Sequence, residues 1–114
     1  MLSVYHLAGI HEREFGPYTD EAEMQAAFAR TAEFNGDLDS AGQLVYAAGL
    51  TPPSEAFTVE RDGTRIPGQL FTADAYLGGF WIITAEDLAQ AREIATRAAA
   101  ACGNAVEVRP LPEE

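Results

Sequence analysis

Residues 77–111 constrain the fold of this chain more than any other stretch, because they predict a strand, a helix and a closing strand in succession. Gly79 to Ile83 is almost entirely apolar, which is typical of a central strand of a sheet. Ala105 to Val108 forms the second predicted strand, and Pro110 ends it because proline cannot donate to a strand ladder.

The helix between these two strands is predicted from its ends and from one apolar stripe. Thr84 is the expected N-cap, with Glu86 and Asp87 in the first turn, where acidic side chains favour the helix dipole. Gly103 is the expected C-terminal stop. The residues predicted to be buried recur at helical spacing: Leu88, Ala91, Ile94, Ala95, Ala98 and Cys102.

The first half of the chain repeats this order of elements. Leu2 to Leu7 reads as a strand, and Asp20 with Glu23 forms a capping-box pair at the start of a helix of about twenty residues. Gly42 supplies the stop, and Gln43 to Leu50 is the next strand. The predicted buried face of this helix comprises Met24, Ala27, Phe28, Thr31, Phe34, Leu38 and Ala41.

A hairpin separates the two halves. Phe57–Glu60 and Thr64–Ile66 flank Arg61-Asp62-Gly63, and an Asp-Gly between alternating runs is a strong hairpin signal. The full order is β-α-β, a hairpin insert, then β-α-β, which predicts an α+β fold of the ferredoxin-like, split βαβ type. We expect a single domain over residues 1–111 and a frayed tail at residues 112–114.

Two helices cover only one face of such a sheet, and the central strands are too apolar for the other face to meet water. A homodimer that packs sheet against sheet is the expected solution, and it would enclose a cavity between the subunits.

The charge of the chain limits its partners. It has 18 acidic residues and 7 basic ones, all arginine, for a formal net charge of −11. Such a surface repels phosphate backbones and anionic lipid, so nucleic acid and membrane are not expected partners. The N-terminus lacks the features of a signal peptide, and the lone Cys102 excludes an intrachain disulfide, which together predict a cytoplasmic protein.

Three segments together resemble the YCII-related proteins, and specifically their DGPF branch. They are Gly42-Gln-Leu-Val-Tyr-Ala-Ala-Gly-Leu50, Leu77-Gly-Gly-Phe-Trp-Ile-Ile83 and Val106-Glu-Val-Arg-Pro-Leu111. The resemblance runs over about residues 1–111 and implies a dimeric α+β barrel of ferredoxin-like subunits.

The chain departs from the family pattern at two places. Pro67 to Thr72 stands where the Asp-Gly-Pro-Phe signature is expected, and it lacks the acid. YciI-like members carry a histidine in the first helix and an Asp-Pro after the second, proposed as a catalytic dyad. Thr31 lies at or next to that histidine position, and the chain has no Asp-Pro, so neither catalytic residue carries over.

Candidate site residues fall in two groups. Tyr5 and His6 on the first strand, Tyr46 on the second and Trp81 on the central strand are expected to line the cavity at the dimer interface, with His6 as a general base. Alternation along the first strand leaves open whether Tyr5 or His6 faces that cavity, and the same aromatic residues also suit a filled interface core.

The second group is the loop Gly68 to Tyr76, which occupies the place of the family signature. Gln69, Thr72, Asp74 and Tyr76 are expected at a pocket rim, although a plain surface connection explains the loop equally well. His6, His11, Glu12 and Glu14 match no established ligand spacing, so we expect no metal site and no cofactor.

These observations favour a small-molecule-binding accessory protein, non-catalytic or weakly catalytic, with its pocket at the dimer interface. One alternative is a small lyase, isomerase or dehydrochlorinase-type enzyme acting on an aromatic or polyketide-like metabolite, as the resemblance implies, with His6 as the base. Another is a structural or regulatory module that binds a protein partner. The sequence does not decide whether a reaction is catalysed.

Overall fold

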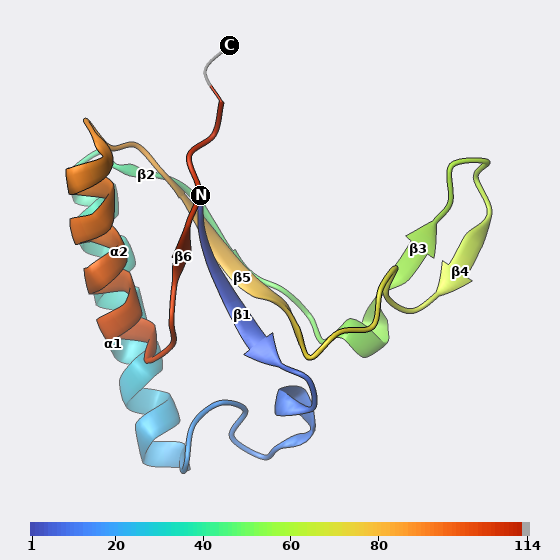
Figure 1. Cartoon of the computed structure of the whole chain (residues 1–114). Coiled ribbons are helices and arrows are strands. Elements are labelled where there is room, and N and C mark those ends of the chain that lie inside the picture. The colour runs from blue at the N-terminus through green and yellow to red at the C-terminus, as the bar shows by residue number, and fades with distance from the viewer. Residues whose placement is uncertain (113–114) are drawn as a thin grey trace.

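The computed structural model describes residues 1–112, so Glu113 and Glu114 of the predicted tail lie outside the described residues. Two α-helices pack side by side on one face of a four-stranded antiparallel sheet with the order β2-β5-β1-β6 (Figure 1). The predicted α+β, ferredoxin-like plan is confirmed. In chain order the elements are β1 (Leu2–Leu7), η1 (Ile10–Glu12), α1 (Glu21–Ser40), β2 (Leu44–Gly49), η2 (Pro53–Glu55), β3 (Phe57–Val59), β4 (Arg65–Pro67), β5 (Ala75–Ile83), α2 (Leu88–Cys102) and β6 (Glu107–Val108).

The ends of α1 follow the sequence signals. Asp20 is the N-cap and its Oδ1 accepts the backbone N–H of Glu23 at 2.7 Å. The Glu23 carboxylate accepts in turn from the backbone N–H of Thr19 at 2.9 Å, one residue before the usual partner in a capping box. Gly42 adopts the left-handed conformation, with φ of 71°, just after the helix. Both predicted ends of α1 are therefore confirmed.

The start of α2 differs from the prediction. Thr84 donates its backbone N–H to the carbonyl oxygen of Gln43 at 2.8 Å and so extends the sheet. Asp87 is the N-cap, with its Oδ1 accepting the backbone N–H of Gln90 at 2.8 Å. The prediction of Thr84 as the N-cap was wrong, because the backbone of Thr84 extends the sheet and the helix begins only at Leu88. Asp87, the residue before Leu88, is the cap instead. Gly103 ends the helix with φ of 74°, as predicted.

The core lies between the helices and the sheet. Phe34 of α1 meets Trp81 of β5 edge to face, with ring centroids 5.7 Å apart. Cys102 is buried in this cluster, as the apolar stripe of α2 predicted. The buried members are Leu2, Val4, Phe34, Leu38, Trp81, Ile94, Ala95, Ala98, Ala101 and Cys102.

The strand β5 is longer than predicted, because Ala75 to Leu77 also pair with β1, and Gly78 lies at the irregularity between Leu77 and Gly79. Gly79 allows a close approach to β2, since a β-carbon there would lie 3.1 Å from the Ala48 carbonyl oxygen. The neighbouring Gly78 leaves room for the ring of His6. The glycine pair is therefore explained by contacts within the sheet.

The hairpin of β3 and β4 projects away from the helices and sheet as an arm (Figure 1). Its turn is as predicted, with Gly63 at φ of 93° and Asp62 accepting the backbone N–H of Thr64 at 2.9 Å. The radius of gyration is 15.7 Å, compared with about 13 Å for a compact domain of this length. The arm accounts for the excess, and its Phe57, Val59 and Ile66 are exposed.

Candidate functional site

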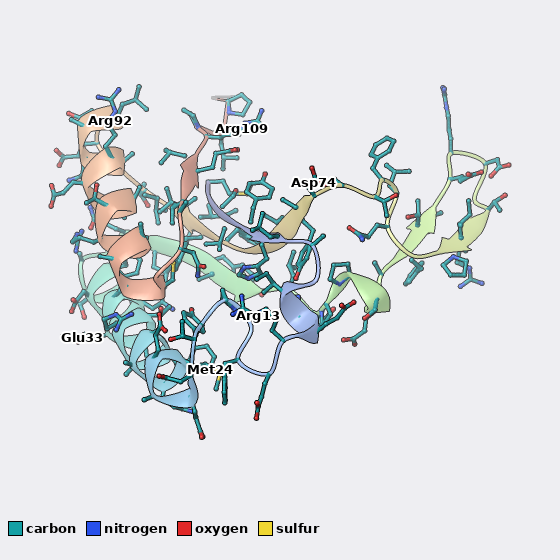
Figure 2. All side chains as sticks on the ribbon, turned by 60° about the horizontal axis from the view of Figure 1, so that its bottom comes forward. Arg13, Met24, Glu33, Asp74, Arg92 and Arg109 are labelled. Atoms are coloured by element: carbon teal, nitrogen blue, oxygen red, sulfur yellow. The ribbon has the colours of Figure 1, made fainter. Side chains whose placement is uncertain are left out.

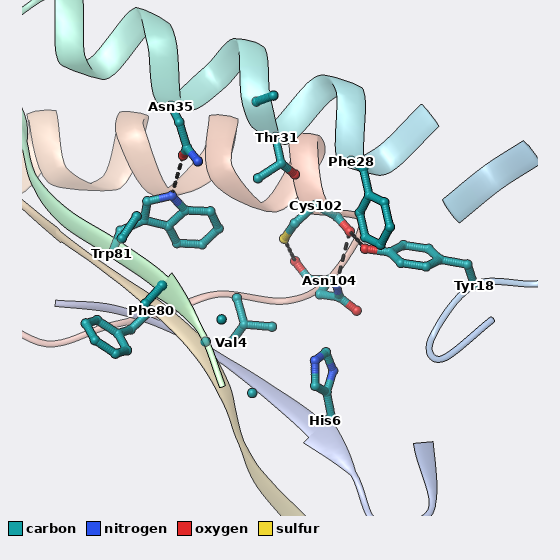
Figure 3. A pocket seen from close by; sticks show the side chains of 16 residues that line it. Val4, His6, Tyr18, Phe28, Thr31, Asn35, Phe80, Trp81, Cys102 and Asn104 are labelled. Carbon is teal, nitrogen blue, oxygen red and sulfur yellow. Dashed lines mark hydrogen bonds between the residues drawn. The ribbon is translucent and has the colours of Figure 1, made fainter. Parts of the chain in front are cut away.

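A cavity of about 430 Å³ opens between α1, the C-terminal end of α2 and the helix-facing side of the sheet (Figure 3). Its volume falls within the range of known small-molecule sites. The residues that line it are Val4, His6, Tyr18, Phe28, Thr31, Ala32, Asn35, Ala47, Ala48, Gly49, Gly78, Gly79, Phe80, Trp81, Cys102 and Asn104.

Trp81 forms the apolar end of the cavity. It is 5% exposed, and its indole Nε1–H donates to the Asn35 side-chain oxygen at 2.7 Å (Figure 3). Because Asn35 lies on α1 and Trp81 on β5, this bond ties the helix layer to the sheet. The Asn35 amide nitrogen keeps its two N–H donors.

The opposite side of the cavity is organised by the end of α2. Tyr18 donates its hydroxyl to the Cys102 carbonyl oxygen at 2.7 Å, and Asn104 donates its amide to the same oxygen at 3.0 Å. The left-handed turn at Gly103 lets Asn104 fold back to reach this oxygen. These bonds satisfy a carbonyl that the helix itself leaves unpaired, and they hold Tyr18 and Asn104 at the cavity wall.

His6 reaches the cavity from β1. Within residues 1–112 its imidazole makes no hydrogen bond, so both ring nitrogens are available to a ligand. Burial lowers the pKa of His6 below its usual 6.5, and the nearby His11 lowers it further. The imidazole is therefore neutral at pH 7, with one nitrogen as acceptor and the other as donor.

The rings of His11 and Tyr76 pack against the imidazole of His6. The His11 ring lies edge-on to it with centroids 5.7 Å apart, and the Tyr76 ring lies edge-on at 5.9 Å. His11 and Tyr76 stack on each other and share a hydrogen bond between His11 Nδ1 and the tyrosine hydroxyl. This pair holds the loop after β1 against the start of β5, next to His6.

The sheet separates the residues that were expected to share one cavity. Tyr5 and Tyr46 lie on the open face, 46% and 60% exposed, and Tyr46 contacts the ring of Phe80 there. His6 and Trp81 lie on the other face, under the helices. Trp81 faces the helix layer, because its cross-strand partners Leu2 and Ala47 pack toward that layer. His6, and not Tyr5, is the residue that alternation along β1 turns toward the cavity.

The loop residues predicted at a pocket rim do not line this cavity. Gln69 and Tyr76 instead border a second hollow of about 300 Å³ at the base of the hairpin arm. The carbonyl oxygen of Asp74 accepts the backbone N–H of Ala8 at 2.8 Å, and Asp74 lies apart from the helices (Figure 2). Thr72 is exposed and lines neither hollow.

Several wall residues were not singled out from the sequence as site residues. Thr31 and Asn35 lie one turn apart on α1, at the margin of its apolar stripe, and both face the cavity (Figure 3). Polar residues within an otherwise apolar helix face are a signal that points to such a wall. Tyr18 and Asn104 carry no comparable signal, because tertiary contacts alone bring these loop residues to the site.

No group of three or more histidine, cysteine, aspartate or glutamate side chains is arranged to hold a metal ion within residues 1–112. No helix in that range has the length and apolar content that crossing a membrane requires.

Residues 6–113 match the YCII-related domain family. The chain belongs to the YCII-related family. A search of the curated proteins finds no match. The match spans essentially the whole chain, so both helices and every residue that lines the cavity except Val4 fall within the YCII-related domain.

Thr31 lines the cavity that also holds His6. This YCII-related chain thus has an imidazole in the cavity that comes from β1 of the sheet, while its α1 contributes a hydroxyl.

Proposed function

We propose that this YCII-related protein binds a small organic molecule in the cavity between α1 and the sheet. The observation that carries the proposal is a hollow of about 430 Å³ with Trp81 at one end and a neutral imidazole, His6, at the other. Apolar walls with a few convergent polar groups are the usual composition of ligand sites. The expected interface between two open sheet faces is a different surface, so the proposed pocket needs only one subunit.

A fragment screen tests this proposal with a built-in reporter. Trp81 is the sole tryptophan of the chain, so its indole N–H gives one resonance in a proton–nitrogen correlation spectrum. We expect ligands to shift this resonance, and His6→Gln to weaken their binding about tenfold through the loss of one hydrogen bond. Gln25→Ala is the control, because Gln25 is exposed on α1 and does not line the cavity. A screen in which no fragment moves the Trp81 resonance contradicts the proposal.

A second candidate, catalysis with His6 as a general base, is supported by the lowered pKa of this histidine. A base must be unprotonated at the working pH and within hydrogen-bond reach of the substrate proton. His6 meets the first condition, and its unbonded nitrogens suit the second. Such a site fits a lyase or isomerase reaction on a bound carbon acid. Turnover of an identified substrate that survives both His6→Ala and His6→Gln would exclude His6 as the base.

The open face of the sheet supports a homodimer as a further part of the proposal. Val45 on β2 is 63% exposed, Tyr5 and Tyr46 are exposed as well, and burying such side chains against a second copy is favourable. The buried, unpaired thiol of Cys102 supports the expected cytoplasmic location. The missing dyad supports placing the chain in the DGPF branch. For the open face of the sheet, a protein partner is the alternative to a second copy of the chain.

A further inference from the structure

The walls of the cavity are uncharged, in a chain where 25 of the 114 residues are acids or arginines (18 + 7). Within residues 1–112, no aspartate, glutamate or arginine lines the cavity. His6 is the one titratable base in the wall, and its burial keeps it neutral at pH 7. A ligand that carried a full charge would therefore enter without a counter-charge, and burying an unpaired charge is strongly unfavourable.

One cationic side chain, Arg30, binds at the C-terminal end of α2. Arg30 donates its Nε–H to the Ala101 carbonyl oxygen at 3.1 Å. This is the C-terminal end of α2, where the helix dipole is negative, so the arginine charge is offset there. Arg30 is absent from the cavity wall, and its charge reaches the wall at Tyr18, where burial raises the pKa and Arg30 lowers it in part.

The polar groups of the wall suit an uncharged oxygen. Thr31 has a hydroxyl that can donate or accept, and the Asn35 amide keeps free N–H donors after it accepts from Trp81. Asn104 keeps its amide oxygen as an acceptor after its nitrogen donates to Cys102, and His6 offers one donor and one acceptor. Both donors and acceptors are therefore present, which matches a hydroxyl or a carbonyl group.

The remaining walls are apolar and aromatic. Trp81 and Phe28 flank the space from the sheet and from α1, and Val4, Ala32 and Ala47 complete it (Figure 3). Aromatic side chains bind planar rings by stacking or edge-to-face contact. Gly49 and Gly79 add backbone without side chains, which leaves room for a flat molecule along the strands.

We infer that the ligand of this cavity is an uncharged planar molecule with a hydroxyl or carbonyl group, and that carboxylates, phosphates and amines are excluded. The inference rests on the proposed function and adds the chemical class of the ligand. The selection is made by the lack of a counter-charge in the wall and not by size, because neutral and charged derivatives of one ring system are similar in size.

The test compares three probes of one ring system: naphthol, naphthoate and naphthylmethylammonium, each substituted at the same ring carbon. Binding to the wild-type chain at pH 7.5 is followed by the Trp81 indole resonance. We expect naphthol to bind at least about tenfold more tightly than either charged probe. Naphthoate or the ammonium probe binding as tightly as naphthol would overturn the inference while leaving the binding function intact. No shift with any of the three would contradict the proposed function itself.

A variant pair tests the physical cause of this selection. Thr31→Lys places a cation in the cavity wall, and we expect it to raise the affinity for naphthoate relative to naphthol by at least about tenfold. Gln25→Lys adds the same charge to α1 at an exposed position outside the cavity and should leave the order of the probes unchanged. If both variants changed the order equally, net charge and not the wall would set the selectivity. If Thr31→Lys does not fold, the order of the probes on the wild-type chain still decides the inference.

Discussion

Gly78 determines where the imidazole of His6 can lie. A β-carbon at this position would overlap the His6 ring, so Gly78→Ala must displace the ring while leaving the imidazole in the protein. We expect the displaced ring to be better hydrated and its pKa to rise toward 6.5, and probe binding to weaken. Gly36→Ala is the control, because a β-carbon there meets nothing within 4 Å and Gly36 does not line the cavity. NMR titration of the histidine ring protons measures the pKa in each variant, and the Trp81 indole resonance measures probe binding. An unchanged His6 pKa in Gly78→Ala would show that the ring is not held by this contact.

The lowered pKa of His6 also predicts how stability depends on pH. Between the folded pKa and 6.5 the unfolded chain binds more protons than the folded one, so stability rises with pH across this window. The contribution is present above pH 6.5 and is lost as the pH falls through the lower folded value. Thermal unfolding of the wild type and of His6→Gln between pH 5 and 8 measures it. We expect the wild type to lose more stability on acidification than His6→Gln; parallel profiles would contradict this.

The N-terminus of α2 is capped by Asp87, so substitutions at Asp87 and at Thr84 should change the free energy of unfolding by different amounts. Asp87→Ala removes the acceptor for the backbone N–H of Gln90, so we expect the free energy of unfolding to fall by about 1 kcal/mol. Thr84→Ala keeps the backbone bond to Gln43 and should change it by less than about 0.5 kcal/mol. Chemical denaturation of both variants measures the difference. A larger loss for Thr84→Ala would restore threonine as the cap.

The open sheet face and the hairpin arm both expose apolar side chains, which a single copy of the chain leaves in water. If the open face forms the proposed homodimer, Tyr46→Glu places a charge in the interface and should produce a monomer. Light scattering coupled to size exclusion measures the mass. Gln25→Glu adds the same charge on the helix layer and should leave the mass unchanged. A wild type that is monomeric at micromolar concentration would contradict the homodimer.

Much of the element order was predictable because it rests on local chemistry. The bounds of β1 match the prediction, and so do the caps of α1 at Asp20 and Gly42, since each depends on residues within a few positions. The burial of Cys102 followed from helical periodicity. The cap of α2 was missed because a contact with a distant strand, at Gln43, decides it.

The two faces of the sheet were beyond prediction for a specific reason. The β1–β5 pairing is irregular between Val4 and Tyr5, and this shifts the alternation of side chains along β5. Tyr76 and Trp81 are five positions apart and would lie on opposite faces of a regular strand, yet Tyr76 contacts the ring of His6 and Trp81 packs under the helices. A second irregularity, in the β2–β5 pairing between Leu44 and Tyr46, shifts the alternation of side chains along β2. One residue of slip exchanges the faces of a strand, and local sequence carries no signal for it.

The sequence by itself therefore determined the α+β class, the order of elements and the presence of His6 and Trp81 on neighbouring strands. Only the tertiary structure decided that these two side chains share a cavity under the helices, that Tyr5 and Tyr46 lie across the sheet from them, and that Tyr18 and Asn104 join the wall. The physical reason is that periodicity and caps act over a few residues, whereas strand register and loop docking are set by contacts between segments far apart in the chain.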